Sequence, residues 1–192
     1  PLPNVKNIIA VASGKGGVGK STVAANLALA LHADGAQVGV LDADIYGPSQ
    51  ARMLGSSGQR PVSKDGEMFE PLDCHGISMI SAGNLFDEED PAVWRGPRVT
   101  SALTQLTFQT RSPELDYLII DMPPGTGDIQ LTLSQKIPVA GAVIVTTPQD
   151  IALIDARKGY KMFEKVSVHV LGVVENMSTF VCPHCHEETA LF

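Results

Sequence analysis

Basic residues are scarce in this 192-residue chain, and they do not cluster. The sequence has 14 Lys and Arg against 21 Asp and Glu, so its formal net charge is −7. Proteins that bind nucleic acids neutralise the phosphates with clustered Lys and Arg, and we therefore expect no nucleic-acid partner. No apolar run approaches the ~18 residues that a membrane-spanning helix needs, and we expect no membrane association.

Aromatic residues are also few, at 5% of the chain, and small aliphatic residues dominate the apolar runs. That composition suits buried parallel strands covered by helices. With 192 residues, 44% of them hydrophobic, the chain is long enough for one domain with a good core and too short for two. We therefore treat 1–192 as a single domain. The chain starts with Pro and stops in the middle of a pattern, and we expect it to be a fragment of a longer protein.

Cysteine occurs three times, at Cys74, Cys182 and Cys185. An odd number, with two of the three in a C-x-x-C pair, argues against a disulfide framework and for metal or redox chemistry. We expect Cys74 to pack as a small buried residue. We also expect the protein to be cytoplasmic.

The most specific motif of the chain is glycine-rich and covers residues 14–21. It fits G-x-x-x-x-G-K-[ST], the phosphate-binding P-loop, and stands between an apolar run and a helical run. Glycines let the backbone aim successive N–H groups at phosphate oxygens, and the start of the helix adds positive partial charge. Lys20 would reach the β- and γ-phosphates, and the Ser21 hydroxyl would ligate Mg²⁺. The residues predicted to bind the nucleotide in this loop are Gly14, Lys15, Gly16, Gly17, Val18, Gly19, Lys20, Ser21 and Thr22.

Apolar and helical segments alternate along the chain. We expect strands at 7–12, 37–41, 117–121, 140–146 and 168–175, the last of these being the final strand, and two short strands at 67–72 and 76–80. We expect helices at 20–32, 49–54, 98–109, 129–135 and 151–165, and an exposed acidic segment at 84–90. With the P-loop, this alternation predicts an α/β fold, a P-loop NTPase three-layer sandwich in which helices flank a mainly parallel central sheet.

Carboxylates stand at the ends of two predicted strands. Asp121 ends the apolar strand at 117–121, and we predict that it holds the Mg²⁺ shell. Asp42 and Asp44 follow the strand at 37–41, at the edge where open α/β sheets bind ligands. We assign Asp44 to the attacking water and Asp42 to the Mg²⁺ shell, although the reverse assignment stays open. The glycine-containing segment 125–128 is predicted to be a switch loop that senses the γ-phosphate.

Lys15 is a second lysine that an ordinary P-loop does not need. No Arg stands where an arginine finger is expected, and Lys15 is the substitute that we favour. It would reach a phosphate across a dimer interface and stabilise transition-state charge in trans. The predicted catalytic residues are therefore Lys15, Lys20 and Asp44.

Cys182 and Cys185 supply two thiolates, which is half of a four-ligand site. Two chains on a symmetry axis would supply four thiolates, the set that a [4Fe–4S] cluster needs. Alternatively, His184 and His186 would complete a zinc site, or the pair would be structural. A thioredoxin-like redox pair is less favoured, because the pair does not open a helix.

Together these motifs resemble the Mrp/ApbC family of iron–sulfur cluster carrier proteins. That family belongs to the deviant Walker A P-loop ATPases, with MinD, the ParA-type partition ATPases and the nitrogenase iron protein. The segments that carry the resemblance are 5–11, 14–21, 42–49, 94–97, 121–128, 147–152, 175–178 and the cysteine pair. The cysteines make the resemblance specific, because MinD and ParA relatives lack them.

The resemblance implies a homodimer that binds ATP and Mg²⁺, bridges a [4Fe–4S] cluster through Cys182 and Cys185 of both subunits, and passes it to apo-proteins. It implies slow ATP hydrolysis, a cross-dimer role for Lys15, and an adenine contact by Asn176.

Family members usually continue past the cysteines, and bacterial ones often carry a small domain before the P-loop, so we expect a truncated chain. His186 stands directly after the second cysteine, where glycine is common in the family. A zinc site at the cysteine pair therefore remains an alternative to the cluster. The alternative functions are a MinD- or ParA-like positioning ATPase without a cluster and a zinc-binding, nucleotide-dependent module.

Overall fold

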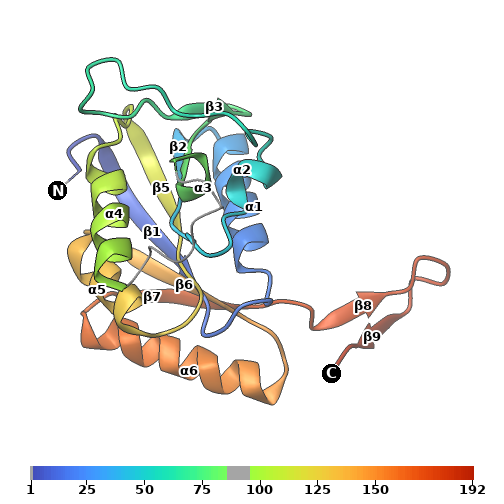
Figure 1. Cartoon of the computed structure of the whole chain (residues 1–192). Helices are drawn as coiled ribbons and strands as arrows, with labels where there is room; N and C mark the ends of the chain where they lie inside the picture. The colour runs from blue at the N-terminus through green and yellow to red at the C-terminus, as the bar shows by residue number, and fades with distance from the viewer. Residues whose placement is uncertain (1, 86–95) are drawn as a thin grey trace.

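A seven-stranded β-sheet forms the centre of the fold (Figure 1). The structure is a computed structural model, and it describes residues 2–85 and 96–192. The strands of the sheet lie in the order β3-β4-β2-β5-β1-β6-β7, and β8 and β9 form a separate two-stranded hairpin. The strands are β1 (Val5–Ala12), β2 (Val38–Asp42), β3 (Leu72–Cys74), β4 (Ile77–Ser81), β5 (Leu115–Asp121), β6 (Gly141–Thr146), β7 (Val170–Glu175), β8 (Thr179–Val181) and β9 (Glu188–Ala190). The helices are α1 (Lys20–Ala33), α2 (Gln50–Met53), α3 (Ala82–Leu85), α4 (Gly96–Phe108), α5 (Asp128–Lys136) and α6 (Asp150–Lys165).

Helices cover both faces of this sheet, and each face has its own hydrophobic core. One core includes Leu103 of α4, Leu133 of α5 and Phe163 of α6. The other core includes Ala24 and Ala28 of α1, whose small side chains let that helix lie close to the strands. None of the helices within residues 2–85 and 96–192 is both long enough and apolar enough to cross a membrane. The predicted three-layer α/β sandwich is confirmed.

Successive residues of the central strands alternate between the two cores. In β5, Leu118 and Ile120 belong to the core of α4, α5 and α6, whereas Ile119 belongs to the core of α1. Side chains of a strand point alternately to opposite faces, so a strand that is buried on both faces must be apolar throughout. This is why the central strands appear in the sequence as unbroken aliphatic runs.

The carboxyl ends of neighbouring strands meet at one edge of the sheet. All pairings in the sheet are parallel except that of β3 with β4. In this register Asp42 of β2 lies opposite Asp121 of β5 on one side and opposite Ser81 of β4 on the other. Val11, near the end of β1, also lies opposite Asp121. The sheet therefore places both acidic strand ends beside the segment that leads from β1 into α1.

The prediction that β7 is the last strand was wrong. The chain continues into the hairpin of β8 and β9, which projects from the body of the molecule and carries both cysteines of the C-x-x-C pair near its tip (Figure 1). Each of its strands has three residues, all of them exposed. Strands this short show no apolar alternation that a sequence pattern could reveal.

Two further predictions were wrong in their details. The short strand expected at 67–72 begins and ends later, as β3. Asn84, expected to be exposed, is buried in α3, where its amide donates to the carbonyl oxygens of Ser56 at 3.3 Å and Gln59 at 2.8 Å. The rest of the expected acidic surface, 86–90, lies outside the described residues, as do Trp94 and Arg95.

Removal of the Phe163 side chain tests the core under α6. Phe163 is fully buried, and we expect Phe163→Ala to lower the free energy of unfolding by about 3–5 kcal/mol, because it removes apolar contacts and leaves a cavity. Tyr160 of the same helix is 50% exposed, and Tyr160→Ala should change this free energy by less than about 1 kcal/mol. Urea unfolding followed by circular dichroism measures both. Similar losses in the two variants would contradict this packing.

Candidate functional site

The glycines of the P-loop have different tasks. Gly17 and Gly19 have φ values of 80° and 87°, a region that side chains other than glycine rarely adopt, and Gly19 directly precedes α1. A Cβ added at Gly14 would lie 2.3 Å from the backbone of Asp155, and one at Gly19 would lie 2.3 Å from the Asn176 amide. A Cβ at Gly16 or Gly17 would meet nothing within 4 Å. Gly14 and Gly19 thus allow close packing, whereas Gly16 and Gly17 face open space.

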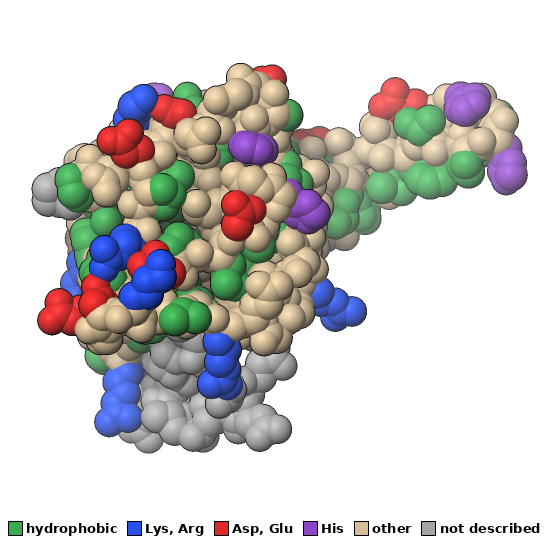
Figure 2. All heavy atoms as spheres, turned by 90° about the horizontal axis from the view of Figure 1, so that it is seen from above, with side chains coloured by type: hydrophobic (Ala, Val, Ile, Leu, Met, Phe, Trp, Pro, Cys, Tyr) green, Lys and Arg blue, Asp and Glu red, His purple; other side chains and the backbone are tan. Residues whose placement is uncertain are grey.

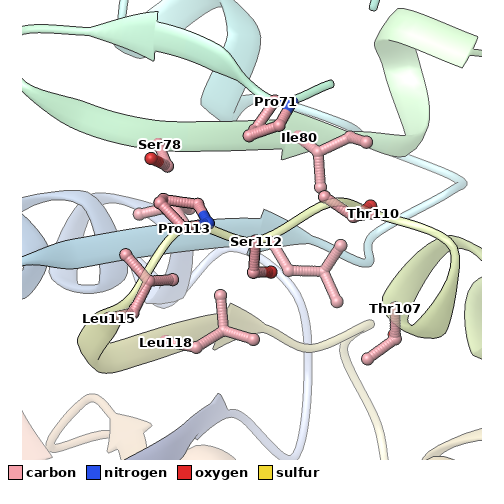
Figure 3. A pocket seen from close by; sticks show the side chains of 11 residues that line it. Pro71, Ser78, Ile80, Thr107, Thr110, Ser112, Pro113, Leu115 and Leu118 are labelled. Carbon is pink, nitrogen blue, oxygen red and sulfur yellow. The ribbon is translucent and has the colours of Figure 1, made fainter. Parts of the chain in front are cut away.

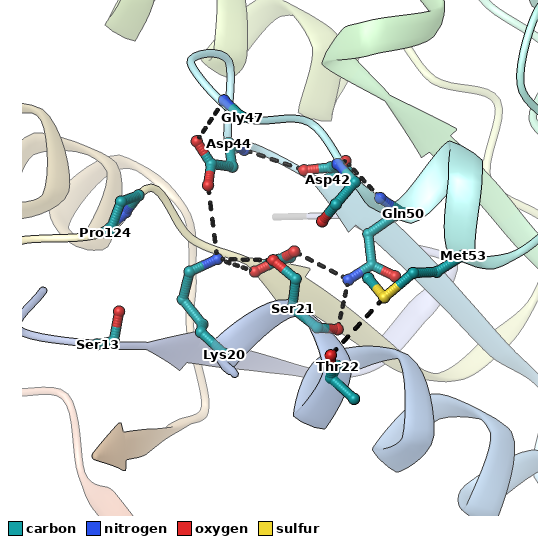
Figure 4. A network of polar contacts seen from close by, with 12 residues as sticks. Ser13, Lys20, Ser21, Thr22, Asp42, Asp44, Gly47, Gln50, Met53 and Pro124 are labelled. Atoms are coloured by element: carbon teal, nitrogen blue, oxygen red, sulfur yellow. Dashed lines mark hydrogen bonds and ion pairs between the residues drawn. The ribbon is translucent and has the colours of Figure 1, made fainter. Parts of the chain in front are cut away.

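A cavity of about 150 Å³ lies on the open side of this loop (Figure 4). The residues that line it are Ser13, Gly16, Gly17, Gly19, Lys20, Ser21, Thr22, Asp44 and Pro124. Backbone N–H groups at the start of a helix and a lysine amine suit phosphate oxygens, and the hydroxyl and carboxylates suit Mg²⁺. The residues present therefore fit a nucleotide phosphate chain with its magnesium ion.

Lys20 lies at the centre of a buried charge cluster (Figure 4). Its side chain is 6% exposed, and its Nζ pairs with the carboxylate of Asp121, which is fully buried. The same Nζ lies 3.3 Å from Ser21 Oγ and 3.9 Å from Asp44 Oδ2. Burial raises the pKa of Asp44, and Lys20 opposes that rise. The structure thus brings together four residues that the sequence predicts for this site.

Asp42 lies next to the cluster, but its oxygens turn toward the segment that follows it. Its Oδ1 accepts one hydrogen bond and its Oδ2 accepts three, at 3.0–3.1 Å. The donors are the backbone N–H groups of Asp44, Ser49 and Gln50 and the hydroxyl of Ser81. Asp42 therefore folds residues 44–50 back over the strand ends. Its place in the Mg²⁺ shell stays a prediction.

Gln50 is a site residue that the sequence analysis missed. It is fully buried, and its Nε2 donates to the carbonyl oxygen of Ser21 at 2.8 Å and to Oδ2 of Asp121 at 2.9 Å (Figure 4). Its one signal in the sequence is its place directly after the acidic segment 42–49. Position alone does not predict that a polar side chain turns inward, because the partners of Gln50 are distant in the chain.

Lys15 and Asn176 lie beside the loop rather than in the charge cluster. Lys15 is half-buried, and its Nζ donates to Oε1 of Gln149 at 3.4 Å. Asn176 follows β7, and its Nδ2 donates to the carbonyl oxygen of Val18 at 2.9 Å. The predicted cross-dimer contact of Lys15 and the predicted adenine contact of Asn176 stay predictions.

The cysteine pair lies at the turn of the projecting hairpin. The backbone N–H groups of Cys185 and His184 point at the sulfur of Cys182 and lower its pKa, which favours the thiolate that binds metals. Across the described residues, no group of three or more Cys, His, Asp or Glu side chains is placed to hold a metal ion. His184 and His186 therefore do not complete a site with the two cysteines in this conformation. Cys74, by contrast, is buried as predicted, and burial raises its pKa.

Hydrophobic side chains run along one side of the hairpin arm (Figure 2). The exposed large hydrophobic residues of the arm are Phe180, Val181, Leu191 and Phe192, which are between 48% and 62% exposed. Two-stranded hairpins are marginal on their own in water, so this apolar side is suited to contact with another surface.

A second cavity lies away from the charge cluster, between the sheet and the segment that follows α4 (Figure 3). It measures about 20 Å³, which is room for a water molecule. The lining residues named in Figure 3 are Pro71, Ser78, Ile80, Thr107, Thr110, Ser112, Pro113, Leu115 and Leu118. No side chain among its lining residues ionises near neutral pH. This cavity therefore offers no acid–base or metal chemistry.

Three features define the class of this protein as a P-loop NTPase. They are the mainly parallel sheet, the glycine-rich turn into a helix and the buried lysine–aspartate pair. The family is more specific. Residues 4–192 match the family described as NUBPL iron-transfer P-loop NTPase, of the ParA group, and the chain belongs to this family. The resemblance inferred from the motifs is confirmed.

Curated relatives match the chain along its full length. It is 64% identical over 192 residues to the iron-sulfur cluster carrier protein of Pseudomonas fragi, a match that covers 100% of this chain and 67% of the relative. It is 62% identical over 191 residues to the protein of that name in Escherichia coli K12. That match covers 100% of this chain and 52% of the relative. It is 55% identical over 194 residues to the iron-sulfur cluster transfer protein NUBPL of Mus musculus. That match covers 100% of this chain and 60% of the relative. The chain thus spans about half to two thirds of the length of these relatives.

Solved structures agree with this assignment. The nucleotide-binding protein of Archaeoglobus fulgidus in complex with ADP superposes with a TM-score of 0.87 at 41% identity, over 100% of this chain and 74% of that chain. The cell division ATPase MinD of Pyrococcus furiosus superposes with a TM-score of 0.69 at 24% identity. That superposition covers 90% of this chain and 72% of the MinD chain. The second likeness concerns the fold alone.

Asp42 makes the stability of the domain depend on pH. Burial, with a contribution from Asp121, raises its pKa from 3.8 to about 6, so the folded state binds this proton more tightly than the unfolded chain does. The contribution of Asp42 to stability is therefore largest at low pH and falls as the pH rises through about 6. Between about pH 4.5 and about pH 7, the wild type should lose about 2 kcal/mol of unfolding free energy relative to Asp42→Asn. Urea unfolding of both proteins at each pH measures this, and parallel pH profiles would contradict it.

Proposed function

We propose that this chain is the ATP-binding part of an iron–sulfur cluster carrier. It binds and slowly hydrolyses ATP with Mg²⁺, holds a [4Fe–4S] cluster together with a second copy of itself, and transfers that cluster to apo-proteins. The observation that carries the proposal is the presence in one chain of a buried Lys20–Asp121 pair beside the P-loop and a projecting hairpin with two thiols. The names of the relatives, which describe cluster carriers, support it.

Nucleotide binding requires that Lys20 changes partner. Its Nζ now pairs with Asp121 and lies 3.9 Å from Asp44, and on this proposal it moves to the β- and γ-phosphate oxygens. Asp121 would then be free to hold the water shell of the cation, and the Ser21 hydroxyl would be a direct ligand. Bound Mg²⁺ would neutralise negative charge on the phosphate oxygens. Asp44 lines the cavity and would orient the attacking water. Asp42 would belong to the Mg²⁺ shell through its place next to Asp121 at the ends of the strands.

Slow hydrolysis follows from the small number of cationic side chains at this site. The described residues that line the cavity include Lys20 but no arginine. Lys15 points instead toward Gln149. Besides Lys20 and the bound Mg²⁺, transition-state charge on the phosphate then has no second cationic side chain from the single chain. We propose that Lys15 of a second copy supplies it, so that hydrolysis needs the homodimer.

The cluster is the cargo, and the hairpin is its carrier site. Cys182 and Cys185 are unpaired thiols, and Cys185 is exposed. The described residues offer no third ligand beside them, so a four-thiolate site needs a second copy of the chain. The apolar side of the arm gives that copy a surface to pack against. An exposed cluster can be passed to an apo-protein without unfolding of the sheet, because the arm lies outside both cores.

Free thiols also suit a reducing compartment, and we propose that the protein is cytoplasmic.

Anaerobic reconstitution with iron and sulfide tests the cargo. We expect a brown dimeric protein with about four iron atoms per dimer, measured by iron analysis and size-exclusion chromatography. Cys182→Ala should lose the cluster, because it removes half of the thiolate ligands. Cys74→Ala is the matched control, since Cys74 lies in β3 and should leave the iron content unchanged. Stoichiometric zinc without a cluster would favour the zinc-binding module. Mg²⁺-dependent ATPase activity without bound iron or zinc would favour a positioning ATPase.

The two loop lysines should separate binding from hydrolysis. We expect Lys20→Ala to lose nucleotide binding, because it removes the amine that contacts the phosphates. We expect Lys15→Ala to keep binding within about threefold and to lose most of its hydrolysis, by about 100-fold or more if this lysine acts as a finger. Calorimetric ADP titration and phosphate release measure the two properties. Hydrolysis at the wild-type rate in Lys15→Ala would refute the dimer argument.

A further inference from the structure

We propose that Gln50 is a positioning residue for the magnesium–nucleotide site: it holds one oxygen of Asp121, so that the other oxygen stays aimed at the cation when Lys20 leaves for the phosphates. This inference rests on the proposed nucleotide function. It adds to that function a residue that neither the P-loop motif nor the acidic strand ends include.

Gln50 ties together three parts of the site that are distant in the sequence. Its backbone N–H donates to Oδ2 of Asp42, at the end of β2, at 3.0 Å. Its Nε2 donates to the carbonyl oxygen of Ser21 in the first turn of α1, at 2.8 Å, and to Oδ2 of Asp121 at the end of β5, at 2.9 Å. A fully buried side chain with this set of contacts has one conformation rather than several.

The chemistry of these partners fixes the orientation of the Gln50 amide. Both the Ser21 carbonyl and the Asp121 carboxylate accept hydrogen bonds, so the NH₂ group must face them and the oxygen must face away. The buried Oε1 has no hydrogen-bond partner among the described residues. This orientation keeps the donor on Asp121 and Ser21.

The two oxygens of Asp121 have different partners. Lys20 pairs with Oδ1, and Gln50 donates to Oδ2. When Lys20 moves to phosphate oxygens, the contact with Gln50 remains and preserves the orientation of the carboxylate. Partners that orient the groups around a metal ion in this way typically change its affinity by about 10–100-fold when they are removed.

Gln50→Leu removes the donor and keeps a side chain of similar size. Its matched control is Gln105→Leu, since Gln105 lies exposed on α4 and bonds only to Gln109 among the contacts described for its side chain. Calorimetric titration of each protein with ADP, in EDTA and at a series of Mg²⁺ concentrations, gives the affinity for the nucleotide and its tightening by the cation. A nonhydrolysed nucleotide gives a readout that does not depend on ATPase activity.

For Gln50→Leu we expect the affinity for ADP in EDTA to stay within about threefold of the wild type, and the tightening by Mg²⁺ to fall about tenfold or more. Gln105→Leu should match the wild type in both. An equal loss with and without Mg²⁺ would mean that Gln50 only shapes the loop, and unchanged tightening would mean that it does not act on Asp121. Either result overturns the inference while the nucleotide function stands.

Two further measurements keep the test decisive. If Gln50→Leu does not fold, Gln50→Met takes its place, because its unbranched side chain is of similar length and has no N–H donor. It should lose the tightening by Mg²⁺ in the same way, and wild-type tightening would overturn the inference. If the wild-type protein itself binds no ADP, the proposed function fails, and the inference fails with it.

Discussion

The buried contact between Lys20 and Asp121 is the interaction on which the rest of the structure depends. Transfer of either charge from water into the protein costs several kcal/mol unless a partner is held in good geometry. The sheet provides that geometry, because β5 ends at Asp121 beside the end of β1, from which the chain turns directly into α1 and Lys20. The parallel register, the glycines of the turn and the small residues of α1 all serve to bring these two side chains together.

The neighbouring acidic groups are accommodated differently. Asp42 shares the end of the sheet with Asp121, whose charge contributes to the raised pKa of Asp42. Neutral donors surround Asp42, from the backbone and from Ser81, whereas Asp121 has the lysine and Gln50. The structure thus separates a carboxylate that organises a loop from one that faces a cation. The same lysine balances the acidic cluster without nucleotide and is the group that phosphate oxygens would attract.

The sheet, its helices and the identity of the residues that meet in the charge cluster could be predicted because those features depend on local chemistry, whereas the contact between Lys20 and Asp121 was not predicted. The P-loop motif specifies Lys20 and Ser21, and aliphatic runs that end in Asp121 identify a buried strand. Gln50 could not be predicted, because its inward orientation depends on acceptors 29 and 71 residues away. Asn84 was misjudged for a similar reason, since its carbonyl partners lie on a distant loop. The three-residue strands of the hairpin have no periodicity to detect.

The projecting hairpin has a consequence for how this protein can vary. Residues of β8 and β9 belong to neither hydrophobic core among the described residues. Substitutions in the arm therefore leave the thermodynamic stability of the sheet nearly untouched, and the folding of the domain does not screen them. What a substitution in the arm can change directly is the surroundings of the two thiols and the exposed apolar side chains beside them. The arm can therefore change while the sheet and the P-loop remain the same.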